Sequence, residues 1–154
     1  MSASMKIYIG IFLMCVLYSC GDSFFYQDYK TLPEETWKPQ ERIAFEVNIP
    51  EKDTYSFVVC IRHTTDFESA NLWCFLNLRD SVRTLFTDTL NLKIAEKDGR
   101  WLGNGVLLKT LEYPLKKEIL LPPGDYNIQL EPGMGKKELK GIRNVGLKIR
   151  KKIK

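Results

Sequence analysis

The chain has 154 residues and a net charge of +4, and this length predicts one domain plus any targeting segment. Charged residues make up 27% and hydrophobic residues 44% of the sequence, a balance that excludes a disordered chain. The single histidine, His63, excludes metal sites that need two imidazole ligands. Composition therefore predicts a globular domain and names no reaction.

The amino-terminal end contains an unbroken apolar run of eleven residues, from Ile7 to Leu17, preceded by one positive residue, Lys6. Eleven helical residues span about 16 Å, roughly half of the hydrocarbon core of a bilayer, so the run is too short for a stable transmembrane helix. This length is typical of the apolar core of a signal peptide.

The sequence Leu17-Tyr18-Ser19-Cys20 follows this run and resembles the bacterial lipobox, with an aliphatic residue three positions before a cysteine and a small residue directly before it. We expect residues 1–19 to be a signal peptide that is removed, Cys20 to carry lipid, and residues 20–40 to form a lipid-anchored segment. Buried acyl chains supply about 0.8 kcal/mol per methylene, which gives stable anchoring. The alternative is an ordinary secretory signal that leaves Cys20 as a free thiol.

From residue 41 to residue 154 the hydrophobic pattern has a period of two, which is typical of β-strands. Phe45, Val47 and Ile49 alternate with polar residues, whereas the runs Tyr55–Arg62 and Leu72–Leu78 are apolar on both faces. Further short strands are expected at residues 82–86, 89–94, 106–111, 119–121, 126–130 and 146–149. Three glycines between residues 98 and 105 predict a turn. The predicted fold class is all-β, an antiparallel β-sandwich of the jelly-roll or immunoglobulin-like type.

Two cysteines, Cys60 and Cys74, fall in neighbouring predicted strands. A hairpin folded about Phe67 would place them opposite each other, within the distance that a disulfide requires. An exported protein occupies a compartment in which a disulfide persists. The alternative is a pair of buried free thiols that pack as small hydrophobic side chains.

The carboxyl-terminal segment from residue 136 onward is strongly basic, because nine lysines and arginines face a single acid, Glu138. After removal of residues 1–19 this segment carries +8 and the rest of the chain −5. Such a segment is a candidate docking surface for an acidic partner or for lipid headgroups. Nucleic acid is not expected, since no aromatic residues alternate with these charges. The alternative is a last strand with a solvated basic fringe.

No motif for catalysis occurs, so we predict no catalytic residue, no metal and no cofactor. Trp37 and Trp101 lie in loop-like surroundings and are candidate binding residues, because an exposed tryptophan stacks on sugar rings or anchors a protein interface. The alternative for both tryptophans is that they cap the hydrophobic core.

Several segments of the chain form a combination whose order and spacing are distinctive. They are the lipobox at Cys20, residues 25–29 leading to Trp37, residues 45–49, Tyr55 with Arg62 in one strand, Asn71-Leu72 opening the next, residues 98–105, 124–126, Met134 and residues 139–147. Taken together, these segments resemble the gliding-motility lipoprotein family GldH of the Bacteroidota.

The resemblance implies a non-enzymatic cell-envelope lipoprotein with a structural or assembly role in the gliding machinery, which in these bacteria is coupled to an outer-membrane secretion system. It implies membrane attachment through Cys20, gliding or secretion lipoproteins as partners, and Arg62 and Asn71 as further candidate binding residues. We expect the domain at the periplasmic face of the outer membrane, because residues 21–23 lack the dense acidic run associated with surface display. The alternative function is a glycan-binding envelope lipoprotein that uses Trp101 or Trp37 for stacking, and a glycan hydrolase is a third possibility.

Overall fold

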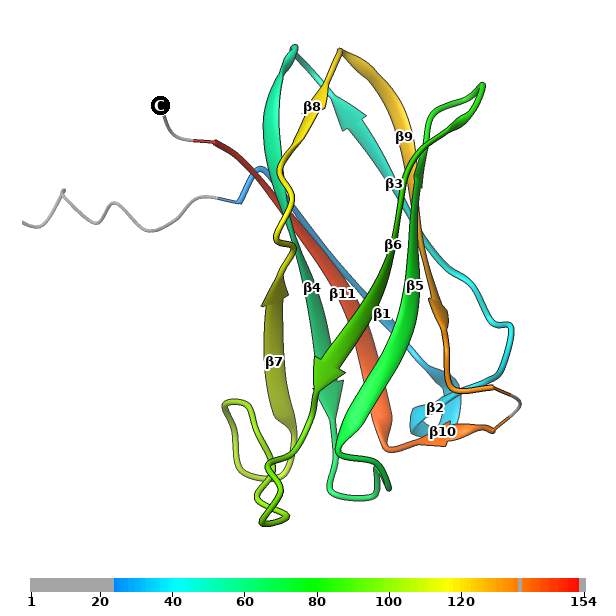
Figure 1. Ribbon diagram of the computed structural model, residues 1–154, viewed down its shortest axis with the longest axis vertical. Helices are drawn as coiled ribbons and strands as arrows, with labels where there is room; N and C mark the ends of the chain where they lie inside the picture. The colour runs from blue at the N-terminus through cyan, green and yellow to red at the C-terminus, as the bar shows by residue number, and fades with distance from the viewer. Residues whose placement is uncertain (1–23, 136, 153–154) are drawn as a thin grey trace, which may run out of the picture.

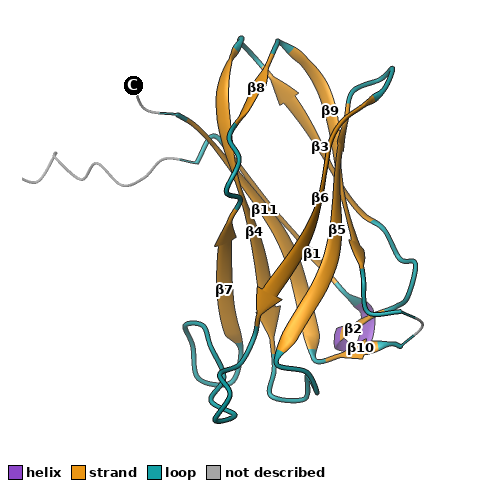
Figure 2. Ribbon diagram, viewed as in Figure 1, coloured by secondary structure: helices purple, strands orange, loops and turns teal. Residues whose placement is uncertain are grey.

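The computed structural model describes residues 24–135 and 137–152, which form two antiparallel β-sheets packed face to face (Figures 1 and 2). The predicted signal peptide and Cys20 lie outside the described residues. Among the described residues, no helix has the length and hydrophobicity needed to cross a membrane.

The five-stranded sheet has the order β1-β11-β4-β7, and β8 pairs with the other end of β4. The bounds of these strands are β1 Tyr26–Thr31, β4 Asp53–His63, β7 Lys109–Pro114, β8 Ile119–Leu121 and β11 Ile142–Lys151. The long strand β4 therefore forms the centre of this sheet, as its doubly apolar sequence predicts.

The four-stranded sheet has the order β3-β9-β5-β6. Its strands are β3 Ile43–Ile49, β5 Asn71–Arg79, β6 Thr84–Lys93 and β9 Gly124–Pro132. A short ladder of β2 Thr36–Trp37 with β10 Leu139–Lys140, together with the 3-10 turn η1 Pro33–Glu35, lies at one end of the sandwich.

The strand order identifies the sandwich as a jelly roll. With β7 and β8 counted as one strand, and the two-residue strands β2 and β10 set aside, the eight strands numbered along the chain lie in the orders 1-8-3-6 and 2-7-4-5. Successive strands cross between the sheets except in the β5–β6 hairpin, which is the double Greek key of a jelly roll. The prediction of an antiparallel β-sandwich is confirmed, and the immunoglobulin-like alternative is wrong.

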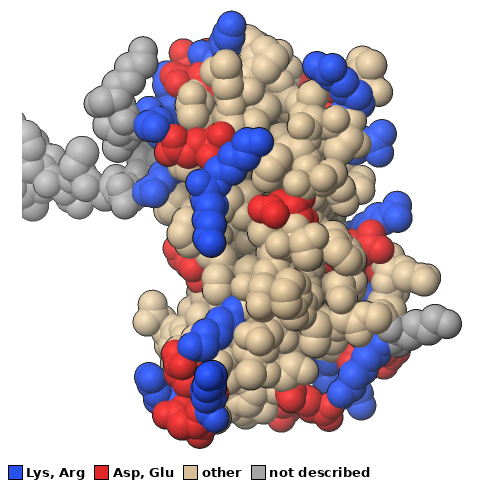
Figure 3. Space-filling view, viewed as in Figure 1, with Lys and Arg blue, Asp and Glu red and all other residues tan. Residues whose placement is uncertain are grey.

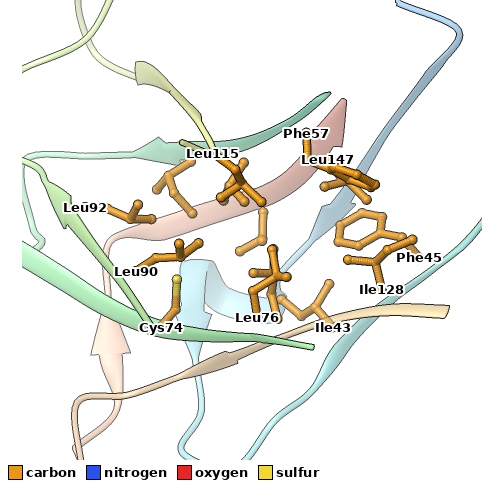
Figure 4. Close-up of a cluster of buried hydrophobic side chains, with 14 of the residues drawn as sticks. Ile43, Phe45, Phe57, Cys74, Leu76, Leu90, Leu92, Leu115, Ile128 and Leu147 are labelled. Carbon is orange, nitrogen blue, oxygen red and sulfur yellow. The ribbon is translucent and has the colours of Figure 1, made fainter. Parts of the chain in front are cut away.

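The core fills the space between the sheets with alternate side chains from each strand (Figure 4). In β3 every second residue is buried, as the period of two predicts. Complete burial of each large apolar side chain contributes about 1.5–3 kcal/mol. The labelled members of this cluster include Phe45, Phe57, Leu76, Ile128 and Leu147.

The sandwich begins at Tyr26 and not at residue 41 as the sequence predicted. Strand β1 pairs with β11 along its whole length, and β2 pairs Trp37 with Leu139. Strand β1 has mostly polar, half-buried side chains because it is a sheet edge, and for this reason the hydrophobic pattern did not reveal it.

Two predicted strand boundaries are also wrong. The expected strands at 82–86 and 89–94 are one continuous strand, β6, which runs from Thr84 to Lys93 and pairs with β5. Strand β7 starts at Lys109 because Gly103 and Gly105 adopt positive φ angles of 99° and 113°, which extends the predicted turn. Val106 and Leu107 therefore lie in a loop, 87% and 85% exposed.

Candidate binding face

The structure places the two predicted tryptophans in or against the core. The Trp37 side chain is 0% exposed, and its indole nitrogen donates a hydrogen bond to the Glu41 carbonyl at 3.0 Å. The prediction of Trp37 as a stacking residue is wrong, because hydrophobic packing inside the sandwich leaves none of its ring surface free. Trp101 is half-buried, with its ring centre 5.5 Å from that of His63. His63 is itself fully buried, so this pair closes one end of the core.

Arg62 and Asn71 do not come together, since they lie on different sheets. The Arg62 guanidinium lies 4.2 Å from the centre of the Tyr29 ring, on the outer face of the five-stranded sheet. The Tyr29 ring in turn lies on Gly146, where a Cβ atom would come within 2.4 Å of it. Asn71 is exposed at the start of β5, and its side chain makes no hydrogen bond within the described part of the chain.

The possible disulfide is absent and the alternative of two buried free thiols is confirmed for Cys60 and Cys74. Cys60 belongs to β4 and Cys74 to β5, and the connection through Phe67 crosses from one sheet to the other instead of forming a hairpin. Both thiols are 0% exposed. Burial raises the pKa of the Cys74 thiol to about 12, so this thiol stays protonated and unreactive.

The basic carboxyl-terminal segment is largely neutralised by acids of neighbouring strands. Lys148 pairs with Glu112 at 2.6 Å, and Lys151 pairs with Glu51 and Asp53 at 2.8 Å each. Further pairs join Lys152 to Glu118, Lys137 to Glu68 and Arg143 to Glu35. The segment is therefore a paired fringe of the sandwich, as the alternative interpretation of its sequence held.

The outer face of the four-stranded sheet carries an exposed aromatic pair that the sequence analysis missed. Trp73 and Phe75 are alternate residues of β5, 42% and 44% exposed. The inward-facing residues of the same strand are all buried. They are Leu72, Cys74, Leu76 and Leu78. The signal was available in the sequence, because a strict period of two separates the Trp73-Phe75 side from the aliphatic side.

Polar side chains surround this aromatic pair, and most of them are uncharged; the charged neighbour of Phe75 is Glu131, which pairs with Arg42 at 2.8 Å. The register places Phe75 between Glu131 and Thr89, and Asn77 between Gln129 and Thr87. We call the following set the aromatic face: Trp73, Phe75, Asn77, Thr87, Thr89, Asn91 and Gln129. Within the described ranges, the amide and hydroxyl side chains of this face make no hydrogen bonds. A shallow depression of about 560 Å³ lies beside Phe75 and is bounded by Asn77, Thr87 and Glu131.

In two other hollows, polar side chains of the lining already bond within the chain. One, of about 400 Å³, lies at the seam between β6 and β7, where the Tyr113 hydroxyl donates a hydrogen bond to the Lys93 carbonyl. The other hollow, of about 340 Å³, is lined by Glu68 and Lys137, which pair with each other at 2.5 Å.

Figure 3 views the molecule in the orientation of Figure 1 and shows a mostly uncharged surface across its lower middle.

The chemistry of the aromatic face fits binding. Aromatic rings with free amide and hydroxyl groups offer both apolar contact area and hydrogen bonds to a ligand. No group of three or more potential metal ligands occurs in the part of the chain that the structure describes.

Comparison with known proteins gives one consistent family. The family model of the GldH lipoprotein matches residues 24–149. The "Gliding motility lipoprotein GldH homolog" of Christiangramia forsetii is 26% identical, over 98% of both chains. The "Gliding motility lipoprotein GldH" of Flavobacterium johnsoniae is 23% identical, over 93% of this chain and 96% of that protein. Among solved structures, "CBM35 from Cellvibrio japonicus Abf62" matches with 13% identity and a TM-score of 0.42, over 88% of this chain and 94% of that chain.

Proposed function

Because the chain belongs to the GldH lipoprotein family, we propose that it has a non-enzymatic structural or assembly role in the gliding-motility machinery. It is a gliding-motility lipoprotein, held at the cell envelope by lipid. The proposal adds that the lipid is attached to Cys20, that the domain faces the periplasm from the outer membrane, and that its partners are gliding or secretion lipoproteins.

The observation that carries this proposal is the exposure of Trp73 and Phe75 on β5, an inner strand of the four-stranded sheet. Large aromatic side chains are enriched among the residues that dominate the energy of protein interfaces. A soluble domain rarely leaves two such side chains side by side in water unless they meet a partner. The aromatic face is therefore the surface that we assign to docking.

In-cell crosslinking in the native bacterium, followed by affinity purification, tests this assignment. The double variant Trp73→Ala/Phe75→Ala should recover at least tenfold less of the gliding or secretion lipoproteins than the unchanged chain. The matched control is Val106→Ala/Leu107→Ala, which removes two exposed apolar side chains from a loop and should recover the partners unchanged. Equal recovery by both double variants would contradict docking through the aromatic face.

A second candidate function is glycan binding, and the free amides and hydroxyls around Trp73 and Phe75 favour it. These groups match the hydroxyls of a sugar chain, while an aromatic ring stacks on the apolar face of a sugar ring. Retention of the purified chain on a glycan array should then be lost in Trp73→Ala/Phe75→Ala. It should be kept in Trp101→Ala, because the Trp101 ring lies against His63 and away from the aromatic face. Loss in Trp101→Ala alone would place the glycan site at the position that the sequence first indicated.

Attachment through Cys20 is tested separately by cell fractionation. Cys20→Ala should release the protein into the soluble fraction. The matched control is Cys15→Ala, which changes a cysteine that leaves with the predicted signal peptide and should preserve membrane association. Continued membrane retention of Cys20→Ala would contradict lipid attachment at this residue.

A further inference from the structure

The chain enters the sandwich over the outer face of the five-stranded sheet. The Phe25 amide donates a hydrogen bond to the Ile149 carbonyl at 3.0 Å, so the start of β1 lies beside the end of β11. The Phe24 ring centre is 4.9 Å from the Lys148 ammonium and 6.0 Å from the Arg150 guanidinium. Figure 1 shows that the start of β1 and the end of β11 lie on the side of the five-stranded sheet.

The predicted lipid site is close to this entry point in covalent terms. Cys20 precedes Phe24 by four residues, which span at most about 14 Å when fully extended. By comparison, the ten residues of β11 extend for about 33 Å. A lipid on Cys20 therefore limits the distance between the beginning of β1 and the bilayer to less than the length of β11.

The surface around the entry point suits a layer of lipid headgroups. Phe24 is half-buried beside Lys148 and Arg150 on this face, and aromatic side chains are favoured at the boundary between membrane and water. The neighbouring lysines are balanced by acids, as in the pairs of Lys148 with Glu112 and Lys152 with Glu118. Balanced charges remove the electrostatic cost of bringing this surface to a headgroup layer.

From this geometry we propose that the outer face of the five-stranded sheet lies against the lipid headgroups of the bilayer that holds the anchor. The aromatic face, on the opposite sheet, then points into the aqueous compartment, where a partner can reach it. The proposal rests on lipid attachment at Cys20, and it assigns an orientation that the proposed function leaves open.

Site-specific fluorescence quenching tests this orientation in the full lipidated chain. Single cysteines are introduced at Gln27, on the outer side of β1, and at Ala44 and Thr87, on the outer side of the four-stranded sheet; all three positions are exposed. The native Cys60 and Cys74 are 0% exposed, so a thiol-reactive fluorophore labels only the introduced position. The labelled proteins are bound to phosphatidylethanolamine–phosphatidylglycerol vesicles that carry a nitroxide on some headgroups.

We expect at least twofold stronger quenching at Gln27 than at Ala44 or Thr87. Equal or reversed quenching in protein that floats with the vesicles would overturn the orientation while leaving lipid attachment intact. Protein that stays in solution would overturn both the attachment at Cys20 and the orientation that depends on it.

Discussion

The outer faces of the two sheets use similar residues in opposite ways. On the five-stranded sheet, Tyr29 lies on Gly146 and is covered by Arg62 at 4.2 Å. On the four-stranded sheet, the Phe75 ring lies beside Gly133, where a Cβ atom would come within 3.3 Å of it. Nothing stacks on Phe75 in the described part of the chain, and its side chain remains 44% exposed.

The difference shows that the partners of an aromatic residue, and not its presence, separate a structural role from a binding role. The Tyr29 ring is thus held between Gly146 and the Arg62 guanidinium, and Gly146 lies opposite the buried Cys60 in the ladder of β11 with β4. Among the described residues, no cation or second aromatic ring stacks on Trp73 or Phe75, which is why we propose this pair for binding. We call the outer face of the five-stranded sheet the closed face, because its aromatic ring is covered within the chain. We call the outer face of the four-stranded sheet the open face, because its two aromatic rings are exposed.

Removal of the Tyr29 ring should break the closed face most strongly. Tyr29→Ala deletes a half-buried aromatic side chain and should lower the free energy of unfolding by about 2 kcal/mol. It should also uncover Cys60, which then reacts with Ellman's reagent in the folded protein, whereas Cys74 between the sheets stays protected. Thiol titration of native protein, with urea denaturation in parallel, measures both effects.

The matched change on the open face is Phe75→Ala. Because Phe75 is 44% exposed and covers neither thiol, this variant should leave both cysteines unreactive and unfold within about 1 kcal/mol of the unchanged chain. Equal thiol exposure in the two variants would show that Tyr29 is not the cover of Cys60.

A methyl group added to each glycine gives a smaller version of the same comparison. Gly146→Ala should lower the free energy of unfolding by about 1–2 kcal/mol, because the new Cβ atom meets a Tyr29 ring that Arg62 holds in place. Gly133→Ala meets a Phe75 ring that is free to turn away, so its cost should be about 0.5 kcal/mol or less. Urea denaturation of the two variants provides the measurement, and equal costs would mean that both rings are held equally.

The sequence predicted the sandwich well where the alternation of side chains is regular. Strand β3 follows the predicted pattern residue by residue, and the doubly apolar β4 lies at the centre of its sheet. Strand β1 was missed because an edge strand with polar, half-buried side chains carries little periodic signal. The choice of a jelly roll came only from pairing partners distant in sequence, such as β1 with β11.

The candidate site was harder to predict, because exposure depends on neighbours that the local sequence does not name. Trp37 follows a polar segment and resembles a loop residue, yet the β2–β10 ladder draws it into the core. Trp73 lies in a run with apolar residues on both faces, yet its position in the four-stranded sheet turns it outward. A strict count of alternate positions in β5 would have found Trp73 and Phe75, but not whether another element covers them.

The smallest expected effect concerns Asp28, whose carboxylate supports the strand that carries Tyr29. A hydrogen bond from Lys30, at 2.6 Å, and one from the Tyr29 amide, at 2.8 Å, hold the pKa of Asp28 below its usual value. A depressed carboxyl pKa in the folded state adds stability above the unfolded pKa of about 3.9, and this stability disappears as the pH falls through the folded value.

Asp28→Asn should therefore lower the free energy of unfolding at pH 7 by a few tenths of a kcal/mol, since the pair is partly exposed to solvent. The difference from the unchanged chain should disappear as the pH falls through the folded-state pKa of Asp28, because the carboxylate that accepts the hydrogen bonds is then protonated. Asp88→Asn is the matched control on the open sheet, because Asp88 accepts a bond from the Thr89 amide at 2.8 Å but has no lysine partner among the described residues. Urea denaturation at several pH values should give a smaller difference for Asp88→Asn, and equal differences would show that the pairing of Asp28 with Lys30 contributes nothing to stability.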